Sequence, residues 1–258
     1  MDYRAIKLEI DNGVAVITMS RPDVMNALNT QMRAEITHAV KAAEAEARVV
    51  VLTGEGKAFC SGQDLGDGGN AASLDLERTL RDEYVPMLRA IVDCKIPTIA
   101  AVNGPAAGAG ANLALAFDVV IASDAAYFVQ AFTRIGLIPD AGGTHFLPRQ
   151  IGSARAMGAA LFADKISATQ AADWGMIYES IPAADFDAHW MARATKLASG
   201  PTVAYQHVKT ALRGSSDNTF EQQLALEAKL QGKCGQTRDF QEGVVSFLQK
   251  RAPVYEGR

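Results

Sequence analysis

The sequence predicts an α/β fold that is followed by an α-helical C-terminal region. Short apolar runs typical of buried strands alternate with amphipathic helical patterns as far as residue 150. Three glycine-rich turns stand beside predicted strands, and Ala-rich helical patterns interrupted by glycine then run nearly to the end. We therefore expect a core over residues 1–195 and a helical region over residues 196–258.

The first elements have the clearest signals. Apolar and charged residues alternate over 6–10, and Asn12-Gly13 is typical of a two-residue hairpin turn, so residues 14–19 are expected to return as the second strand. Asn29 is placed to cap an amphipathic helix, and a compact apolar strand follows at 49–53. Strand, helix and strand in this order predict a right-handed crossover.

A second unit of the same kind follows along the chain. The patterns predict a helix over 75–93, a strand over 97–102, a small-residue turn with a helix over 104–116, and a buried strand over 118–122. The segment 66–83 is expected to form part of a pocket wall, because polar, glycine-containing connections often carry binding residues.

Composition excludes several functional classes. The chain has 258 residues, 48% of them hydrophobic, and a formal net charge of -4. No basic stripe is present for phosphate neutralisation, so a nucleic-acid partner is not expected. Three distant cysteines provide neither a disulfide framework nor a metal-ligand spacing. No apolar run reaches the roughly 18 residues of a membrane span, and we expect a cytoplasmic protein without a membrane or metal partner.

The familiar nucleotide, serine-hydrolase and zinc motifs are missing from the sequence. Leu113 stands where the dinucleotide fingerprint that begins at Gly108 needs its last glycine, and neither a P-loop, a Gly-x-Ser-x-Gly elbow nor a His-x-x-x-His pair occurs. What remains is backbone N–H groups in small-residue turns, which can hold an oxyanion. Asp140 lies in one such turn, either as the cap of a helix that begins near Gly143 or as an acid/base.

Four stretches together resemble the crotonase (enoyl-CoA hydratase/isomerase) superfamily. They are Arg21-Pro22 with Asn26-Ala27-Leu28, residues 58–65, residues 102–110 and residues 136–144. The resemblance implies a ClpP/crotonase-like spiral of ββα repeats with a helical C-terminal trimerisation region. It also implies an acyl-CoA substrate, a homotrimer or a dimer of trimers, and no cofactor apart from the coenzyme A that belongs to the substrate.

The resemblance also implies roles for individual residues. By motif position, the backbone N–H groups of Gln63 and Ala109 would hold the thioester carbonyl, and Asp140 would be the catalytic acid/base of isomerase-type members. Because those two donors are main-chain groups, the side chains can vary. Coenzyme A would be bound by two groups of residues, which are Ser61, Gln63, Asp64 and Leu65 in one loop, and Phe247 and Lys250 near the C-terminus.

Two departures from the hydratase pattern favour an isomerase. Family hydratases carry two glutamates at the positions that hold Asn112 and Phe132 here, and neither an amide nor a phenyl ring can deprotonate water. One carboxylate suffices for a proton shift, so Asp140 alone could move a double bond. Asn112, Phe132 and Ile138 are expected to line the substrate pocket, and its apolar wall should raise the pKa of Asp140.

Within the superfamily, the chain most resembles the isomerases that convert ring-1,2-epoxyphenylacetyl-CoA to an oxepin in phenylacetate degradation. The similarity lies in residues 106–110, 128–132, 136–140, 154–158 and 174–177. Such isomerases also resemble enzymes that shift a Δ3 double bond of an enoyl-CoA to Δ2.

Several alternatives stay open from the sequence. The chain could be a hydratase of fatty-acid β-oxidation that uses Asp140 alone, or a non-catalytic member that binds acyl-CoA or RNA. A dehalogenase-like reaction would use Asp140 as a nucleophile with His145 as its partner. The side chains of Arg78, Arg81 and Tyr84 are expected to face solvent rather than the acyl group.

Overall fold

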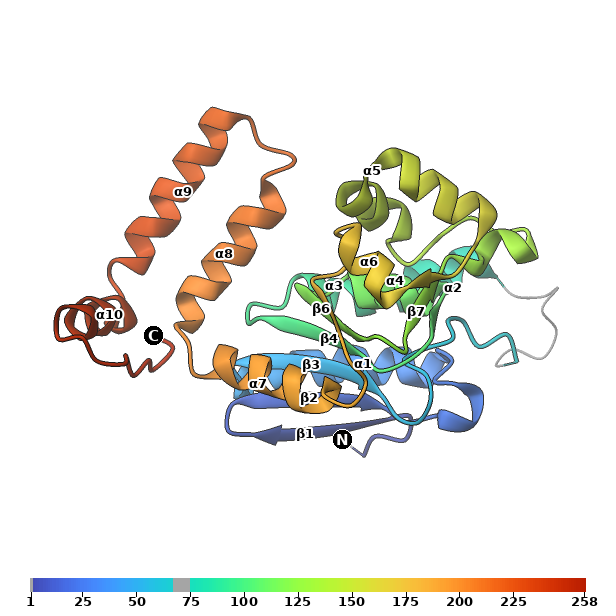
Figure 1. Ribbon diagram of the computed structural model, residues 1–258, viewed down its shortest axis with the longest axis horizontal. Coiled ribbons are helices and arrows are strands. Elements are labelled where there is room, and N and C mark those ends of the chain that lie inside the picture. Colours follow the sequence, from blue (N-terminus) through green and yellow to red (C-terminus); the bar gives the residue numbers. More distant parts are fainter. Residues whose placement is uncertain (1, 67–74) are drawn as a thin grey trace.

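The computed structural model describes residues 2–66 and 75–258 (Figure 1). Part of the 66–83 segment that we expected in a pocket wall therefore lies outside the described residues. A six-stranded sheet in the order β1-β2-β3-β4-β6-β9 forms the centre of the fold, with β1 antiparallel to β2 and all other neighbours parallel. Its strands are β1 (Ile6–Asp11), β2 (Val14–Met19), β3 (Val49–Gly54), β4 (Thr98–Val102), β6 (Val119–Ser123) and β9 (Glu179–Ile181).

The N-terminal hairpin is confirmed. Asn12 and Gly13 have φ angles of 48° and 77°, so both turn residues occupy the left-handed region that a twisted two-residue turn requires. Asp11 pairs with Val14 across this turn. The predicted cap is also confirmed, because the side chain of Asn29 accepts a 2.9 Å hydrogen bond from the backbone N–H of Met32 at the start of α1.

Helices cover both faces of the central sheet. Val50 and Leu52 of β3 belong to one hydrophobic cluster with α1 (Thr30–Glu46) and α3 (Val85–Val92). Val49 and Val51, which point the opposite way, pack in a second cluster with α7 (Phe186–Ala198). Strands buried on both sides need apolar residues at every position, which explains the unbroken apolar run of β3.

A small second sheet includes part of the glycine-rich stretch at residues 104–110. It consists of β5 (Ala106–Ala107), β7 (Tyr127–Val129) and β8 (Ile166–Ser167) in the order β5-β7-β8. Around it lie α4 (Ala109–Leu115), a 3-10 helix (Ala131–Ile135), α5 (Gly143–Phe162) and α6 (Ala168–Asp173). We predicted none of these three strands, nor β9, because two or three residues are too few to show an alternating pattern.

The helix expected over 75–93 has three parts. α2 (Leu76–Thr79) begins after Asp75, continues as a π-helical segment (Leu80–Tyr84) and leads directly into α3. A single π segment changes the direction in which the following side chains point, and such segments are frequent at functional sites. Tyr84, at its end, is buried rather than facing solvent.

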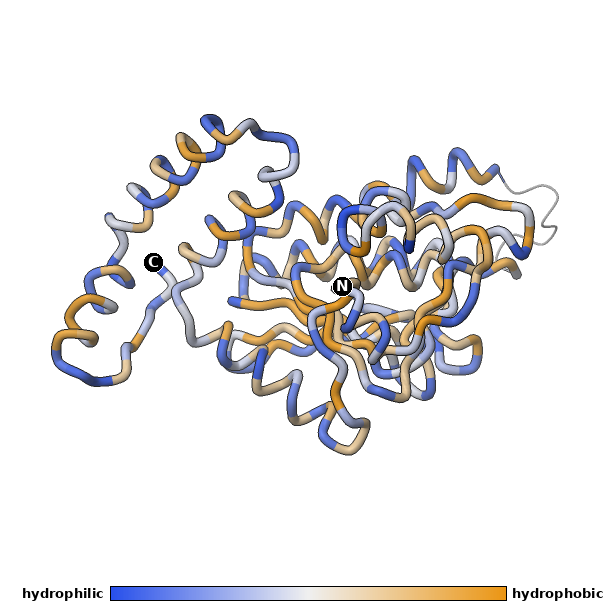
Figure 2. The backbone as a smooth tube through the Cα atoms, turned by 45° about the horizontal axis from the view of Figure 1, so that its top comes forward, coloured by the Kyte–Doolittle hydropathy of each residue, from blue (hydrophilic) through white to orange (hydrophobic). Residues whose placement is uncertain are grey.

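The last three helices project away from the sheet (Figure 1), and they are α8 (Thr202–Gly214), α9 (Phe220–Cys234) and α10 (Arg238–Leu248). Lys209 and Arg213 tie α8 to the core, because each forms a 2.7 Å ion pair with Asp118. Figure 2 shows hydrophobic stretches along these projecting helices. In the described part of the chain, no helix combines the length and the apolar character needed to cross a membrane.

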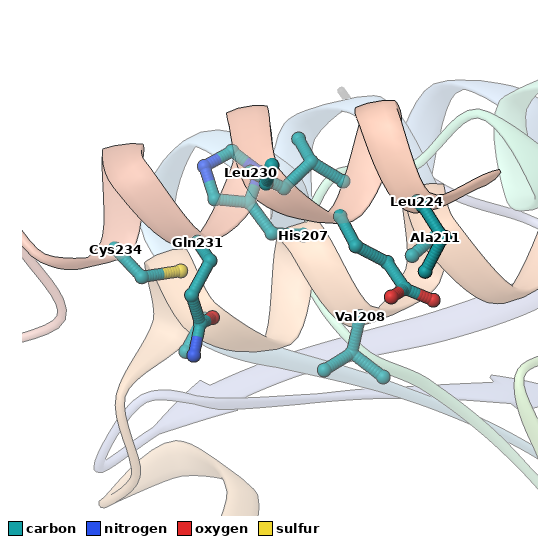
Figure 3. Close-up of a pocket in the computed structure, with 10 residues that line it drawn as sticks. His207, Val208, Ala211, Leu224, Leu230, Gln231 and Cys234 are labelled. Carbon is teal, nitrogen blue, oxygen red and sulfur yellow. The ribbon is translucent and has the colours of Figure 1, made fainter. Parts of the chain in front are cut away.

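A cavity of about 600 Å³ lies between α8 and α9 (Figure 3). Its lining is mostly apolar, with His207, Glu227 and Cys234 as the residues that carry reactive groups. Among the described residues, no hydrogen bond joins any two of these three side chains, so no nucleophile is paired with a base there.

Candidate active site

The wall of a cavity of about 290 Å³ contains residues from the three glycine-rich turns and from the π-helical segment. The loop that contains Ser61 and Gln63, the start of α4, and the stretch from Ala131 to Asp140 each form part of its wall. The remaining wall is apolar and comes mainly from Leu65, Leu76, Leu80, Tyr84, Phe132, Ile135 and Leu137. A concave apolar site with a few convergent polar groups is the usual form of a small-molecule site.

The two expected oxyanion donors, Gln63 and Ala109, both line this cavity. Ala109 is the first residue of α4, where a backbone N–H has no acceptor within the helix. Leu28 holds the residues on either side of Gln63 by backbone hydrogen bonds. The N–H of Leu28 donates to the carbonyl of Gly62 at 2.8 Å, and the carbonyl of Leu28 accepts from the N–H of Asp64 at 3.1 Å. In the described part of the chain, neither the Gln63 nor the Ala109 N–H has an acceptor.

Close contact between the two turns requires glycine at position 62. Gly62 has a φ of +96°, and a Cβ there would lie 2.8 Å from the carbonyl oxygen of Ala107 and 3.4 Å from the nitrogen of Ala109. Any side chain would therefore push the loop away from the start of α4. The loop that contains Gln63 and the start of α4 therefore lie close together in the wall of the same cavity.

Asp140 is the single carboxylate among the described residues that line the cavity. Burial raises its pKa from 3.8 to about 6, in the direction that the apolar surroundings predicted. Its Oδ1 is buried and has no hydrogen-bond partner in the described structure. A carboxylate with a raised pKa and a free oxygen is suited to accept and return a proton near neutral pH.

The alternative that Asp140 caps a helix is wrong. Gly142 occupies the cap position of α5, and no side chain caps this helix. Asp140 contributes only its backbone carbonyl, which accepts a 2.8 Å bond from Gly143. Ala141 and Gly142 follow with φ angles of 47° and 83°, so two consecutive left-handed residues turn the chain sharply after Asp140.

A buried polar network supports the Gln63 side of the cavity. Arg33, a fully buried residue of α1, donates to Gln63 Oε1 at 3.0 Å and forms a 2.5 Å ion pair with Glu83. Tyr84 donates to the same Gln63 oxygen at 2.6 Å, and the Arg33 guanidinium lies 4.8 Å from its ring centre. We did not predict this network from the sequence, because its members are up to 51 residues apart.

Two residues expected in the substrate pocket lie outside its lining. Ile138 is 76% exposed, because neighbouring side chains along non-helical backbone point in opposite directions and Leu137 takes the inward place. Asn112 is fully buried behind the wall, where its amide bonds to the backbone of Asp140. Phe132 does line the cavity.

The residues expected to bind coenzyme A are divided. Ser61, Gln63 and Leu65 line the cavity, whereas the side chain of Asp64 turns away to form a 2.8 Å ion pair with Arg21. The other two expected contacts, Phe247 and Lys250, do not line this cavity. They are exposed at the end of α10, which lies at the opposite end of the molecule from α2 (Figure 1).

Neither the dehalogenase-like alternative nor a cysteine nucleophile finds support in the geometry. His145 is exposed on α5 and does not line the cavity, so it is poorly placed to activate water beside Asp140. Cys60 is fully buried, and burial raises the pKa of its thiol to about 12. Across the described residues, no group of three or more His, Cys, Asp or Glu side chains is arranged to hold a metal ion.

Comparison with known proteins identifies the family to which a chain with this fold and this site belongs. The family described as Enoyl-CoA hydratase/isomerase matches residues 9–258. The chain belongs to this family, which is part of the crotonase superfamily, and it has the crotonase fold.

Individual relatives carry both hydratase and isomerase names. The chain is 60% identical over 258 residues to a "Probable enoyl-CoA hydratase" of Rhodobacter capsulatus, with all of both chains covered. It is 41% identical over 254 residues to a "1,2-epoxyphenylacetyl-CoA isomerase" of Escherichia coli, covering 96% of this chain and 97% of the other. A crystal structure of a putative enoyl-CoA hydratase/isomerase from Mycobacterium abscessus superimposes with a TM-score of 0.94 at 38% identity, covering 98% of this chain and 100% of the other.

Proposed function

We propose that this protein is an acyl-CoA isomerase that moves a double bond with a single carboxylate. The observation that carries the proposal is Asp140, the one acidic side chain among the described cavity-lining residues, with its raised pKa and unpaired oxygen. Gln63 and Ala109 both line this cavity, and their backbone N–H groups would hold the thioester oxygen.

In the proposed reaction, the Asp140 carboxylate removes a proton from C2 of a 3-enoyl-CoA. The C–H electron pair moves into the C1–C2 bond, and negative charge collects on the thioester oxygen, where the two N–H donors stabilise it. The protonated Asp140 then returns the proton to C4 as the C3–C4 double bond becomes C2–C3. Atoms and charge balance without a water molecule or any group beyond this chain and the substrate.

Coenzyme A binding by Ser61, Gln63 and Leu65 fits their place at the cavity. Phe247 and Lys250 can contact coenzyme A at this cavity only from another copy of the chain, because α10 is at the far end of the same molecule (Figure 1). This position supports association of several copies, and we propose the homotrimer or dimer of trimers that the family resemblance implies. Exposed large apolar side chains on the projecting helices support association, and they include Leu212, Phe220, Leu224, Phe240, Phe247 and Leu248.

The ring epoxide of phenylacetyl-CoA is the acyl substrate that the resemblance and the 41% identical isomerase favour. Apart from Asp140, the wall beside the acyl position is largely apolar and includes Phe132 and Tyr84. Aromatic side chains can stack on a flat, partly unsaturated ring. A simple 3-enoyl chain would occupy the same space.

Hydration is the second candidate, because the 60% identical relative has a hydratase name. In such a reaction Asp140 alone would have to deprotonate water and supply the proton to C2. The side chain of Phe132 occupies the wall where family hydratases carry a carboxylate, so a second acid/base is missing on that side.

Two substrates offered to one preparation separate the candidates. The purified protein is incubated in ¹⁸O-labelled water with 3-hexenoyl-CoA and, separately, with crotonyl-CoA. The isomerase predicts rapid formation of 2-hexenoyl-CoA without label and little 3-hydroxybutyryl-CoA. Labelled hydroxyacyl product formed faster than the isomer would establish the hydratase instead.

A further inference from the structure

Behind the cavity wall lies a pair of buried amides that none of the proposed chemistry uses. Asn112 in α4 and Gln130 after β7 are essentially without solvent contact. The side-chain Nε2 of Gln130 donates to Oδ1 of Asn112 at 2.8 Å. Buried amides are costly unless they are hydrogen-bonded, so the arrangement calls for a physical explanation.

The other end of Asn112 reaches the turn that carries the proposed base. Its Nδ2 donates a 2.7 Å hydrogen bond to the backbone carbonyl of Asp140. The same carbonyl accepts the N–H of Gly143 at 2.8 Å, so two donors fix one oxygen. Glycine is required at position 143, because a Cβ there would lie 2.3 Å from Nδ2 of Asn112.

The backbone carbonyl of Asp140 determines the orientation of the Asn112 amide. If it were rotated by half a turn, Oδ1 would face the Asp140 carbonyl oxygen, and Nδ2 would face the NH₂ group of Gln130. The contact with Asp140 would then be repulsive, because two acceptors would meet, whereas Gln130 could turn its amide and accept with Oε1, which has no partner in the described structure. Asn112 therefore acts as a donor toward Asp140 and as an acceptor toward Gln130.

Asn112 also belongs to the helix that begins with the second oxyanion donor. It lies three residues after Ala109, and its own N–H bonds to the carbonyl of Gly108 at 3.1 Å. We propose that Asn112 is a positioning residue that joins the oxyanion helix to the Asp140 turn and so sets the place of the base relative to the thioester. The inference rests on the isomerase function proposed above.

This role explains why position 112 suits an amide rather than a carboxylate. A negative side chain there would meet the Asp140 carbonyl oxygen and would disfavour ionisation of the Asp140 carboxyl. Among the described residues that line the cavity, the other titratable or charged groups are Tyr84 and Arg134, and Arg134 is held by a hydrogen bond to the carbonyl of Ala163.

The test compares two isosteric variants, Asn112→Asp and Asn112→Leu, using 3-hexenoyl-CoA across a range of pH. Displacement of a base by about 1 Å can cost about 100-fold in rate, so we expect kcat to fall by about that factor in both, with KM nearly unchanged. Asn112→Asp should also shift the acid limb of kcat to higher pH, whereas Asn112→Leu should leave the limb near its wild-type position. Asn103→Asp is the matched control, because its amide also bridges two backbone groups but lies outside the cavity lining.

The outcomes separate this inference from the proposed function. Wild-type kcat and pH dependence in both Asn112 variants, together with an inactive Asp140→Asn, would overturn the positioning role and leave the isomerase intact. Reduced thermal stability with unchanged kcat per folded molecule would also overturn it. Undiminished turnover by Asp140→Asn would instead remove the proposed function itself. If Asn112→Leu does not fold, Gln130→Leu removes the hydrogen bond that Asn112 accepts and should lower kcat without changing KM.

Discussion

The hydroxyl of Tyr84 donates a 2.6 Å hydrogen bond to the side-chain oxygen of Gln63, a residue that lines the cavity. Arg33 donates to the same oxygen at 3.0 Å. Two donors from different helices therefore hold the side chain of Gln63 in one orientation. This arrangement connects the buried ion pair of Arg33 and Glu83 to the proposed oxyanion hole.

Tyr84→Phe should loosen that connection while leaving the aromatic wall in place. Loss of one hydrogen bond costs about 0.5–1.5 kcal/mol, so we expect kcat for 3-hexenoyl-CoA to fall by about 3- to 10-fold and the melting temperature to drop slightly. Steady-state kinetics and thermal unfolding measure both effects. Tyr178→Phe, at an exposed position, is the matched control and should match the wild type. An unchanged kcat in Tyr84→Phe would mean that the Tyr84 hydrogen bond has no part in positioning Gln63.

The dependence of kcat on pH should follow the ionisation of Asp140. Burial raises the pKa of Asp140 to about 6, and the base must be ionised to accept the C2 proton. Activity should therefore rise with pH through about 6 and level off above it, rather than near the ordinary aspartate value of 3.8. A kcat profile between pH 4.5 and 8.5 measures this limb. A flat profile over that range would contradict Asp140 as the base.

The free energy of unfolding should show the opposite dependence on pH, through the same residue. Because the pKa of Asp140 is higher in the folded state, the folded protein keeps a proton that the unfolded chain has lost between pH 3.8 and about 6. The contribution of this site to stability therefore decreases as pH rises through that window.

Asp140→Asn removes the free-energy cost of keeping an ionised carboxylate at this buried position. After allowance for solvent at the cavity, we expect the variant to be more stable than the wild type by about 1–2 kcal/mol at pH 8 and nearly equal near pH 3.5. Urea unfolding at the two pH values provides the comparison. A variant that is less stable at pH 8 would show that Asp140 makes favourable interactions in the folded state.

Ala109→Pro deletes one proposed oxyanion donor with little expected harm to the helix. Position 109 is the first residue of α4, where proline is tolerated because the N–H has no helical acceptor. Loss of one donor typically lowers kcat by about 100- to 1000-fold, and we expect KM to change little. Arg238→Pro, at the first residue of α10, controls for the insertion of proline at a helix start. A correctly folded Ala109→Pro variant with nearly wild-type kcat would place the hole elsewhere.

The sequence predicted the parts of the fold whose signals are local. The hairpin at Asn12-Gly13 and the cap at Asn29 depend on adjacent residues, and both were found as expected. The raised pKa of Asp140 was also predicted, from the apolar wall expected around it. The strands of two or three residues were missed, because the partner strand rather than the residue pattern creates them.

Side-chain direction was harder to predict than position in the chain. Ile138 was expected in the pocket and points outward, whereas Tyr84 was expected in solvent and points inward. The direction of Tyr84 depends on a π-helical segment, and that of Ile138 on an irregular turn, so neither follows from a regular period of residues. Asn112 was expected to line the pocket. It lies next to Asp140, but it is buried behind the residues that line the cavity.

The most direct test of the central claim is the conversion of 3-hexenoyl-CoA to 2-hexenoyl-CoA by the wild type and by Asp140→Asn at pH 8. Asp173→Asn, an exposed aspartate outside the cavity lining, is the matched control. We predict rapid conversion by the wild type and the control, and a loss of about 10²- to 10⁴-fold in Asp140→Asn, with binding of the ester retained. Conversion by Asp140→Asn at the wild-type rate would contradict the single-carboxylate mechanism.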